Sequence, residues 1–257
     1  MVDIHSHILW GVDDGPASIE ESVAMLKAAG DSGTTDIVAT PHANPRYVFD
    51  HDLAQRRIQE LAAAVGVPPK IHVGCEFHLS FDNVDHLMES LATYTINARQ
   101  YLLVECPDFH IGSHTETVFR RLVAAGIVPI VAHPERNPVL RQKLARVEAW
   151  VELGCLMQLT ALSITGGFGA SARTASIRLI ERGLAHIVAS DAHDPVNRHP
   201  RLLEARQAVA SRFGEDVAEI LFIDNPRAVV EGAPLLGGKQ AYCQAPARWY
   251  QFWKQSR

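Results

Sequence analysis

Nine side chains that can bind metal ions occur in this sequence, most of them just beyond the end of a short apolar run. The first run, Met1-Val2-Asp3-Ile4, leads directly into His5-Ser6-His7. Residues i and i+2 of a strand point to the same face, so both imidazoles can reach one ion. Imidazoles and carboxylates suit Mn, Fe or Zn, and the set contains no cysteine, so a catalytic site of several metal ions is predicted rather than a structural zinc site. The nine candidate ligands are His5, His7, Asp14, His42, Glu76, Glu105, His133, Asp191 and His193.

The repetition of this placement carries more weight than any single residue. A lone His-X-His at the start of a chain is often a surface accident, but here six apolar runs end in the same kind of side chain. Acidic and imidazole groups beside buried strands carry a large desolvation cost unless cations neutralise them. The pattern therefore favours metal binding over isolated surface residues.

The elements that must position these ligands alternate between strands and helices. Such alternation predicts parallel strands with right-handed crossovers. Because candidate ligands follow nearly every strand, a closed barrel is favoured over an open sheet, and seven units predict an α/β fold of the distorted (β/α)7 TIM-like type. Pro129 lacks an amide donor and is expected to make its strand less regular. The predicted strands cover residues 2–6, 35–40, 70–75, 101–105, 127–132, 155–160 and 184–190.

The first predicted helix begins with a capping box. Ser18 is expected to accept from the amide of Glu21, the Glu21 carboxylate to reach back, and Gly33 to follow the helix end. Apolar stripes at helical spacing predict further helices at 53–65, 118–125, 147–153, 177–180 and 202–213.

The sequence is expected to become irregular after Asn225-Pro226-Arg227. We therefore expect one barrel domain over 1–231 and an aromatic-rich tail over 232–257. The tail aromatics are expected to pack on the chain's own body, with an oligomer contact or a partner site as alternatives. They are Tyr242, Trp249, Tyr250, Phe252 and Trp253.

Composition bounds the function. With 257 residues, of which 47% are hydrophobic and 21% charged, one α/β domain can bury a full core. The net charge of -5 and the lack of a dense Lys/Arg run argue against nucleic-acid binding. No apolar leader precedes the first strand and no run of about 18 apolar residues occurs, so we expect a cytoplasmic protein without membrane insertion.

The cysteines are scattered without C-x-x-C spacing, and none has an arginine six positions later. Buried free thiols are expected, and the C-x5-R pattern of cysteine-dependent tyrosine phosphatases is missing. Any phosphate chemistry must therefore depend on metal ions. The cysteines are Cys75, Cys106, Cys155 and Cys243.

Two opening motifs, Met1-Val2-Asp3-Ile4-His5-Ser6-His7-Ile8-Leu9 and Gly11-Val12-Asp13-Asp14-Gly15-Pro16, resemble the start of the PHP (polymerase and histidinol phosphatase) family. The sequence shows this similarity from residue 1 to about 231. The Asp13-Asp14-Gly15 turn, and Glu105 where many relatives carry histidine, make it most similar to the manganese-dependent protein tyrosine phosphatases of bacterial capsule and exopolysaccharide operons. The later motifs are Ala39-Thr40-Pro41-His42, Gly74-Cys75-Glu76, Leu103-Val104-Glu105, Ala132-His133-Pro134-Glu135-Arg136, Ala189-Ser190-Asp191-Ala192-His193 and Asp224-Asn225-Pro226-Arg227.

This resemblance implies three divalent ions, Mn in the first place, with Fe or Zn as alternatives. A bridging Glu76 keeps two ions within about 4 Å of each other, and such a cluster lowers the pKa of bound water, giving a hydroxide for in-line attack on phosphorus. No protein nucleophile is required. The implied sets are His5, His7, Glu76 and Asp191 for one ion, Asp14, His42 and His193 for a second, and Glu76, Glu105 and His133 for a third.

Two arginines resemble the family's phosphate-binding residues: Arg136, three residues after His133, and Arg198, five after His193. A guanidinium fork suits two phosphoryl oxygens and stabilises charge that grows in the transition state. Arg46-Tyr47 and Phe109-His110 are weaker candidates for substrate contact. Structural or exposed positions are expected for His51, His72, His86, His186 and His199, whereas His78, His110 and His114 stay undecided.

The resemblance implies a protein tyrosine phosphatase that acts on the phosphotyrosine tail of an autophosphorylating kinase regulating polysaccharide export. One alternative is a phosphatase for a small metabolite such as histidinol phosphate, and another is a non-catalytic metal-binding regulator. The complete set of candidate ligands argues against a regulator that has lost catalytic activity. The excess of acidic over basic residues disfavours an exonuclease. The sequence leaves a homo-oligomer open.

Overall fold

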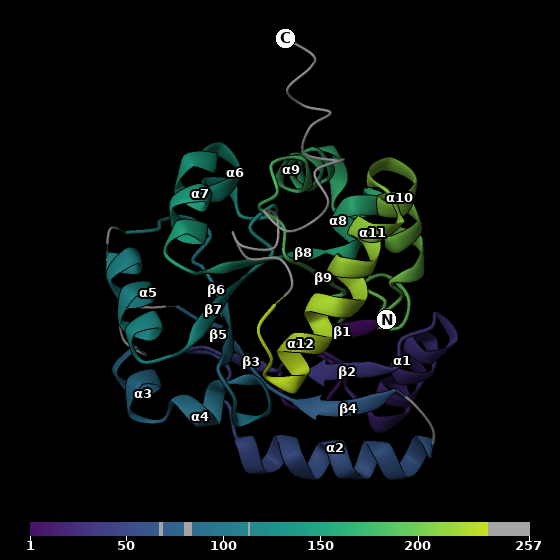
Figure 1. The fold of residues 1–257 in the computed structure, drawn as a ribbon. Coiled ribbons are helices and arrows are strands. Elements are labelled where there is room, and N and C mark those ends of the chain that lie inside the picture. Colours follow the sequence, from purple (N-terminus) through teal and green to yellow (C-terminus); the bar gives the residue numbers. More distant parts are fainter. Residues whose placement is uncertain (67–68, 80–83, 113, 236–257) are drawn as a thin grey trace.

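The computed structural model describes residues 1–66, 69–79, 84–112 and 114–235, in which parallel strands lie at the centre and helices surround them (Figure 1). The strands form two sheets, in the orders β1-β2-β4 and β3-β5-β6-β7-β8-β9, and every pairing is parallel. The α/β fold predicted from the alternating pattern is confirmed. The strands are β1 Val2–Ser6, β2 Asp36–Ala39, β3 His42–Ala43, β4 Lys70–Val73, β5 Glu76–His78, β6 Tyr101–Glu105, β7 Val128–Ala132, β8 Leu156–Thr160 and β9 Ile187–Ala189.

The two sheets lie one after the other around a single barrel, in which the backbone hydrogen bonding between neighbouring strands is not continuous. Only Thr40-Pro41 separates β2 from β3, and only Gly74-Cys75 separates β4 from β5, so each pair is one predicted strand with an interruption. Backbone hydrogen bonds span the interruption, from the amide of Gly74 to Ala39 O at 2.9 Å and from that of Glu76 to Pro41 O at 3.1 Å. When each interrupted pair is counted as one strand, the barrel has seven strands, as predicted.

Strands β1 and β9 are the first and last strands of the barrel, and few backbone contacts join them. A single bridge joins Ser6 to Ala192, and the amide of Asp191 donates to His5 O at 2.8 Å. The buried carboxylate of Asp3 accepts from the amides of Ser190 at 3.0 Å and His5 at 3.3 Å, and burial raises its pKa to about 6. A side chain thus replaces part of the missing ladder.

Two predicted irregularities are wrong. Pro129 lies inside β7 opposite Leu102 without interrupting the strand. The chain also stays helical beyond Asn225-Pro226-Arg227, because Pro226 stands in the first turn of a helix, where its missing N–H costs little. That helix, α12 (Asn225–Glu231), packs Val229 against the barrel interior and ends at Gly232, whose φ of +67° is left-handed.

The capping box at the first helix is confirmed with one difference. The Ser18 hydroxyl accepts from the amide of Glu21 at 3.4 Å, but the Glu21 carboxylate accepts from the amide of Ala17 rather than from that of Ser18. This first helix is α1 Ile19–Asp31. The other helical segments before α12 are α2 His51–Val65, α3 Val84–Glu89, α4 Leu91–Tyr94, η1 Ile96–Ala98, α5 His114–Ala124, α6 Pro138–Gln142, α7 Leu144–Glu152, α8 Ala161–Thr165, α9 Gly169–Glu181, α10 Leu203–Phe213, α11 Glu215–Glu219 and η2 Ile220–Asp224.

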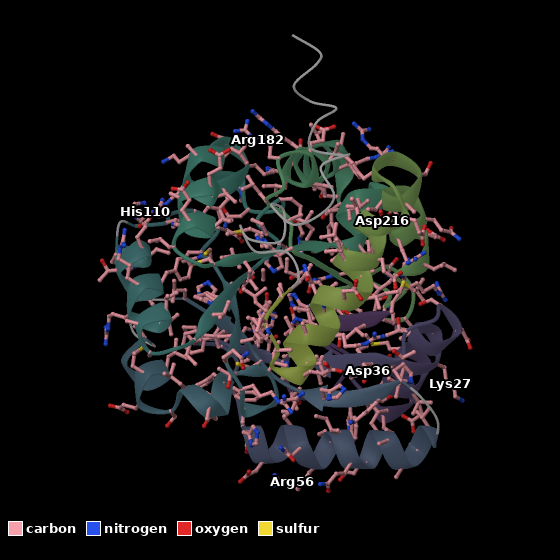
Figure 2. All side chains as sticks on the ribbon, viewed as in Figure 1. Lys27, Asp36, Arg56, His110, Arg182 and Asp216 are labelled. Carbon is pink, nitrogen blue, oxygen red and sulfur yellow. The ribbon has the colours of Figure 1, made fainter. Side chains whose placement is uncertain are left out.

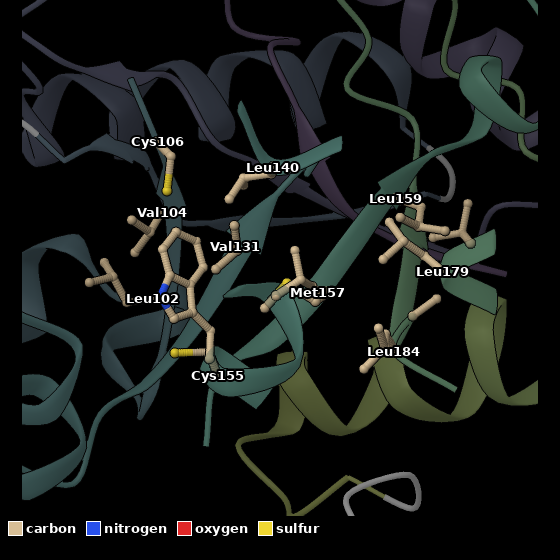
Figure 3. Packing of buried hydrophobic residues seen from close by; sticks show 14 of the residues in the cluster. Leu102, Val104, Cys106, Val131, Leu140, Cys155, Met157, Leu159, Leu179 and Leu184 are labelled. Carbon is tan, nitrogen blue, oxygen red and sulfur yellow. The ribbon is translucent and has the colours of Figure 1, made fainter. Parts of the chain in front are cut away.

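The largest part of the core lies between the sheet and the helices that follow β6 and β7. The indole of Trp150 packs edge-on against Phe119, with ring centroids 5.0 Å apart. The same core cluster contains Leu102, Val104, Val131 and Met157 from the strands (Figure 3). Charged ends such as those of Lys27, Arg56 and Arg182 point outward (Figure 2). Among the described residues, no helix is long and apolar enough to cross a membrane.

The tail predicted over 232–257 cannot be compared with the structure beyond its first residues, because residues 236–257, with all five tail aromatics, lie outside the described residues.

Candidate metal centre

All nine candidate ligands converge where the carboxyl ends of the strands meet. Each belongs to at least one group whose ligand atoms all lie within 4.8 Å of one another. Most of the side chains are deeply buried, whereas Asp14 and Glu105 are 45% and 25% exposed. The centre therefore has a buried floor and an accessible side. The groups are His7, Asp14, His42 and His193; His5, His7 and Glu76; His5, His133 and Asp191; and His42, Glu76 and Glu105.

The two imidazoles of the His5-Ser6-His7 pair present the same nitrogen to the centre. His5 Nδ1 lies 2.8 Å from Gln158 Oε1, and the amide group of Gln158 donates its own N–H to Leu159 O, so His5 Nδ1 is the donor. His7 Nδ1 donates to Asp13 Oδ2 at 2.6 Å. Each ring therefore turns Nε2 toward the centre, in the orientation that such outer partners give to imidazoles that bind metal ions.

His193 and His42 form a second group around Asp14. His193 Nδ1 donates to the backbone oxygen of Asp191 at 3.1 Å, and its Nε2 lies 3.4 Å from Asp14 Oδ1. The Nε2 of His42 lies 3.3 Å from the same oxygen. Hydrogen bonds from these two imidazoles hold the pKa of Asp14 well below its ordinary value, so the carboxylate is charged.

Glu76 stands at the middle of the centre. Its Oε2 lies 3.4 Å from His5 Nε2 and 3.2 Å from His7 Nε2, and its Oε1 lies 2.9 Å from His133 Nε2. Burial alone would raise the pKa of Glu76, but the surrounding imidazoles outweigh it and hold that pKa well below its usual range. A carboxylate whose two oxygens face different imidazoles is suited to bridging two ions.

Glu105 completes the centre on its accessible side. Its Oε1 lies 3.8 Å from His133 Nε2. Burial, followed by the charge of Glu76, raises the pKa of Glu105 to about 7. Like charges held this close favour a cation between them.

The spacings within the centre match those of ligands that share an ion. Two atoms that each lie about 2.0–2.2 Å from one ion are separated by about 3.0–3.5 Å in tetrahedral or octahedral geometry. His5 Nε2 and His7 Nε2 are 3.3 Å apart, and His42 Nδ1, a buried nitrogen without a hydrogen-bond partner in the described part of the chain, lies 3.1 Å from Glu76 Oε2. The residues present fit divalent ions.

Backbone strain also marks the centre. His133 and Asp191 have φ values of +35° and +52°, a region that side chains other than glycine seldom adopt. Such strain persists only where the surrounding structure imposes it, and it is concentrated at functional sites. His133 directly follows β7, Asp191 lies two residues beyond the end of β9, and both side chains belong to the centre.

The two predicted arginines meet on one carboxylate at the edge of the centre. Arg136 and Arg198 both donate to Asp191 Oδ2, the latter at 2.8 Å, while Asp191 Oδ1 lies 3.4 Å from His5 Nε2. Burial alone would raise the pKa of Asp191, but His5 and the two guanidiniums lower it well below its ordinary value. Both arginines remain about one quarter exposed, at 26% and 28%, so an anion can reach them.

Among the weaker substrate candidates, Tyr47 lies beside the centre. Its ring is nearly parallel to that of His42, with centroids 6.0 Å apart, and the Arg46 guanidinium lies 5.0 Å from the Tyr47 ring centroid. Phe109 is 95% exposed on the loop after β6, and His110 is exposed beside it.

The other histidines divide as follows. His72 pairs with Asp36 at 2.9 Å, and buried His186 accepts from the amide of Met157, so both are structural as expected. His51 and His199 are half-buried, as is the undecided His78, whereas His114 is exposed. The side chain of His86 lies outside what the structure describes.

The described cysteines are free and buried, as predicted. Burial raises the pKa of all three thiols, that of Cys155 to about 12, so no thiolate is available among them. Cys243 lies outside the described residues. This part of the chain therefore offers no cysteine nucleophile.

Two residues that orient the ligands were missed at the level of sequence. Asp13 fixes His7 and also accepts from the amide of His42 at 3.0 Å, and Gln158 fixes His5. Gln158 did carry a signal, because it is the one amide in the buried strand Leu156–Thr160. A polar residue in such a strand needs a partner.

Comparison with known proteins assigns the chain to a family. The model of the CpsB/CapC family, described as capsular polysaccharide synthesis, matches residues 1–231. The chain belongs to this family. CapC from Staphylococcus aureus is 40% identical over 202 residues, which cover 77% of this chain and 79% of that protein. The tyrosine-protein phosphatase YwqE from Bacillus subtilis is 31% identical over 96% of this CpsB/CapC chain and 95% of its own length.

Solved structures agree with this assignment to the CpsB/CapC family. A crystal structure from work on YwqE of Bacillus subtilis and CpsB of Streptococcus pneumoniae, described as unique metal-dependent tyrosine phosphatases, matches with a TM-score of 0.85. It is 30% identical and covers 91% of this chain and 96% of that chain. The lactonase Lmo2620 from Listeria monocytogenes matches with a TM-score of 0.57 at 13% identity, which shows a shared barrel fold alone.

Proposed function

We infer that this protein is a metal-dependent protein tyrosine phosphatase. The observation that carries this function is the convergence of nine imidazole and carboxylate ligands, with two guanidiniums on the outer oxygen of one of them. Membership of the CpsB/CapC family and the similarity to tyrosine phosphatases support it. The absence of a thiolate among the described residues fits chemistry that depends on metal ions.

Three divalent ions, Mn in preference to Fe or Zn, are the cofactors of this proposal. The spacing of the ligand atoms and the imidazole–carboxylate donor set support it. When bound, such ions acidify water and neutralise phosphoryl oxygens. One ion belongs to His5, His7, Glu76 and Asp191, a second to Asp14, His42 and His193, and a third to Glu76, Glu105 and His133.

Arg136 and Arg198 bind the phosphoryl group in this mechanism. Their guanidiniums both donate to Asp191, and each side chain is about one quarter exposed at the edge of the centre. Planar N–H pairs match two phosphoryl oxygens and stabilise the charge that develops as the P–O bond breaks. The cysteines among the described residues offer no thiolate, so in this proposal water rather than a cysteine attacks phosphorus.

The substrate we propose is the phosphotyrosine tail of a bacterial tyrosine autokinase that regulates capsular or exopolysaccharide synthesis in the cytoplasm. The exposure of Asp14 and Glu105 leaves one side of the centre open to a peptide, and the family belongs to capsular polysaccharide synthesis. Residues 1–231 form the catalytic unit in this proposal, and 232–257 form an appended tail.

The test is a comparison of substrates by the Mn-loaded protein. Phosphate release is measured from a phosphotyrosine peptide and from histidinol phosphate, with His5→Ala as the inactive control. Faster release from the peptide is expected. A preference for histidinol phosphate would move the function to small-metabolite chemistry, and no release from either would leave a non-catalytic metal-binding regulator.

A second comparison isolates the arginines. Replacing Arg136 with Ala is expected to lower kcat far more than the Mn content, because its guanidinium contacts phosphate and is not itself a ligand. Arg182→Ala, on the surface beside Glu148, is the matched control and should leave both unchanged. Unchanged turnover in Arg136→Ala would remove Arg136 from the mechanism.

A further inference from the structure

One aromatic ring contacts both phosphate-binding arginines. Phe168 stands at the N-terminus of α9, on the segment that follows α8, and it is half-buried. The guanidinium carbon of Arg136 lies 4.2 Å from the centre of its ring, and that of Arg198 lies 5.8 Å from the same point. Both distances fall within the roughly 6 Å over which an aromatic face attracts a cation.

The arginines have few other contacts that fix their direction. Both donate to Asp191 Oδ2, and Arg198 also donates to the backbone oxygen of Asp191 at 3.2 Å. The buried Nε of Arg198 has no hydrogen-bond partner among the described residues. The two guanidiniums are both positively charged and share one carboxylate oxygen, so they repel each other. Each long side chain also retains rotamer freedom, which this one hydrogen-bond acceptor removes only in part.

We propose that Phe168 is a positioning residue that holds Arg136 and Arg198 in the orientation in which they receive phosphoryl oxygens. This inference rests on the proposed function for the role of the two arginines. The electron-rich face of the ring offsets the repulsion between the guanidiniums, and its apolar body excludes water from them, which strengthens their attraction for an anion. Phe168 contacts neither the substrate nor an ion in this account.

The role of the ring is tested by replacements that keep or remove its aromatic face. Phe168→Leu keeps an apolar side chain without the face, and Phe168→Trp keeps the face. The control is Phe213→Leu, because Phe213 lies under Arg212 at 5.5 Å in α10 and Arg212 pairs with Glu181. The measurements are kcat and KM on a phosphotyrosine peptide, Mn content, and the affinity of the Mn-loaded protein for inorganic phosphate by calorimetry.

Phe168→Leu is expected to lower kcat/KM about 5- to 30-fold, which corresponds to about 1–2 kcal/mol, and to weaken phosphate binding by a comparable factor. Mn content should not change, because the ring acts on the two arginines and not on a candidate ligand in this proposal. Phe168→Trp should restore both quantities, and Phe213→Leu should leave them at the wild-type values. Wild-type kcat/KM and phosphate affinity in Phe168→Leu would overturn the proposal.

A double replacement separates positioning from a general structural effect. In a protein that already carries Arg136→Ala and Arg198→Ala, adding Phe168→Leu should cause no further loss of phosphate affinity, because the residues through which the ring acts are gone. The same loss in both backgrounds would overturn the positioning role. Failure of the proposed function is a different result, in which the wild type releases no phosphate from the peptide while the calorimetry still reports on Phe168.

Discussion

The turn that places Asp13 and Asp14 allows a quantitative test of the centre. A Cβ added to Gly15 would lie 2.3 Å from the backbone oxygen of His7, whereas real Cβ contacts stay above 3.0 Å, so Gly15→Ala must separate the turn from His7 by at least 0.7 Å. The amide of Gly15 also donates to Asp13 Oδ1 at 3.0 Å, so this movement disturbs the partner of His7 Nδ1.

Two effects of different size follow from this displacement. Overpacking of this kind lowers the free energy of unfolding by about 1–3 kcal/mol. Metal ligands tolerate deviations of only about 0.2 Å, and the loss of an outer partner of a ligating histidine weakens metal binding about 10- to 100-fold. Gly15→Ala should therefore weaken Mn binding by at least this factor.

Gly11 provides the matched control in the same loop. Its φ of +68° makes alanine unfavourable by about 1–2 kcal/mol, but an added Cβ would meet nothing within 4 Å. Gly11→Ala should thus lose stability similarly while binding Mn like the wild type. Calorimetric titration of metal-free protein with Mn, together with chemical unfolding, measures both quantities. Wild-type Mn affinity in Gly15→Ala would refute the reasoning about the turn.

Two further predictions concern an outer partner and a buried histidine. Asp13→Asn, which removes the carboxylate from His7 Nδ1, should weaken Mn binding about 10- to 100-fold, and an unchanged titration would contradict that role. His186 has its pKa lowered by burial from 6.5 to about 4, so below pH 6.5 the unfolded chain takes up a proton that the folded protein does not. The lowered pKa of His186 therefore makes its full contribution to the free energy of unfolding above about pH 6.5. This contribution falls by about 2 kcal/mol between pH 7.5 and 5. His186→Asn, which keeps an acceptor for the Met157 amide, should lose stability less steeply over this range in chemical unfolding experiments, and an equal slope would exclude His186 as the cause.

The convergence of the nine candidate ligands could be predicted from the sequence because their placement depends on local geometry. A strand of period two aims His5 and His7 together, and parallel strands bring their carboxyl ends to one rim. The same reasoning applies to Glu105, the last residue of β6, and to His133, which directly follows β7. These predictions needed no knowledge of long-range packing.

What escaped prediction depends on packing between distant segments. Helix α9 is longer than the predicted 177–180 because small residues such as Ala172 and Ser176 form its buried face, and these give no apolar stripe. Helix α12 persists after Pro226 because Val229 packs into the barrel interior, far from it in sequence. Phe168 could not be connected to Arg136 and Arg198 because three separate rim segments bring them together.

The central claim is that the nine-ligand centre hydrolyses phosphotyrosine with bound metal ions. Its most direct test measures phosphate release from a phosphotyrosine peptide by metal-stripped protein titrated with Mn, with Glu76→Gln as the comparison. The account predicts no release without metal, saturable recovery with Mn in the wild type, and no recovery in Glu76→Gln, because Glu76 faces His5, His7 and His133. Release by the metal-free wild type, or full recovery in Glu76→Gln, would contradict it.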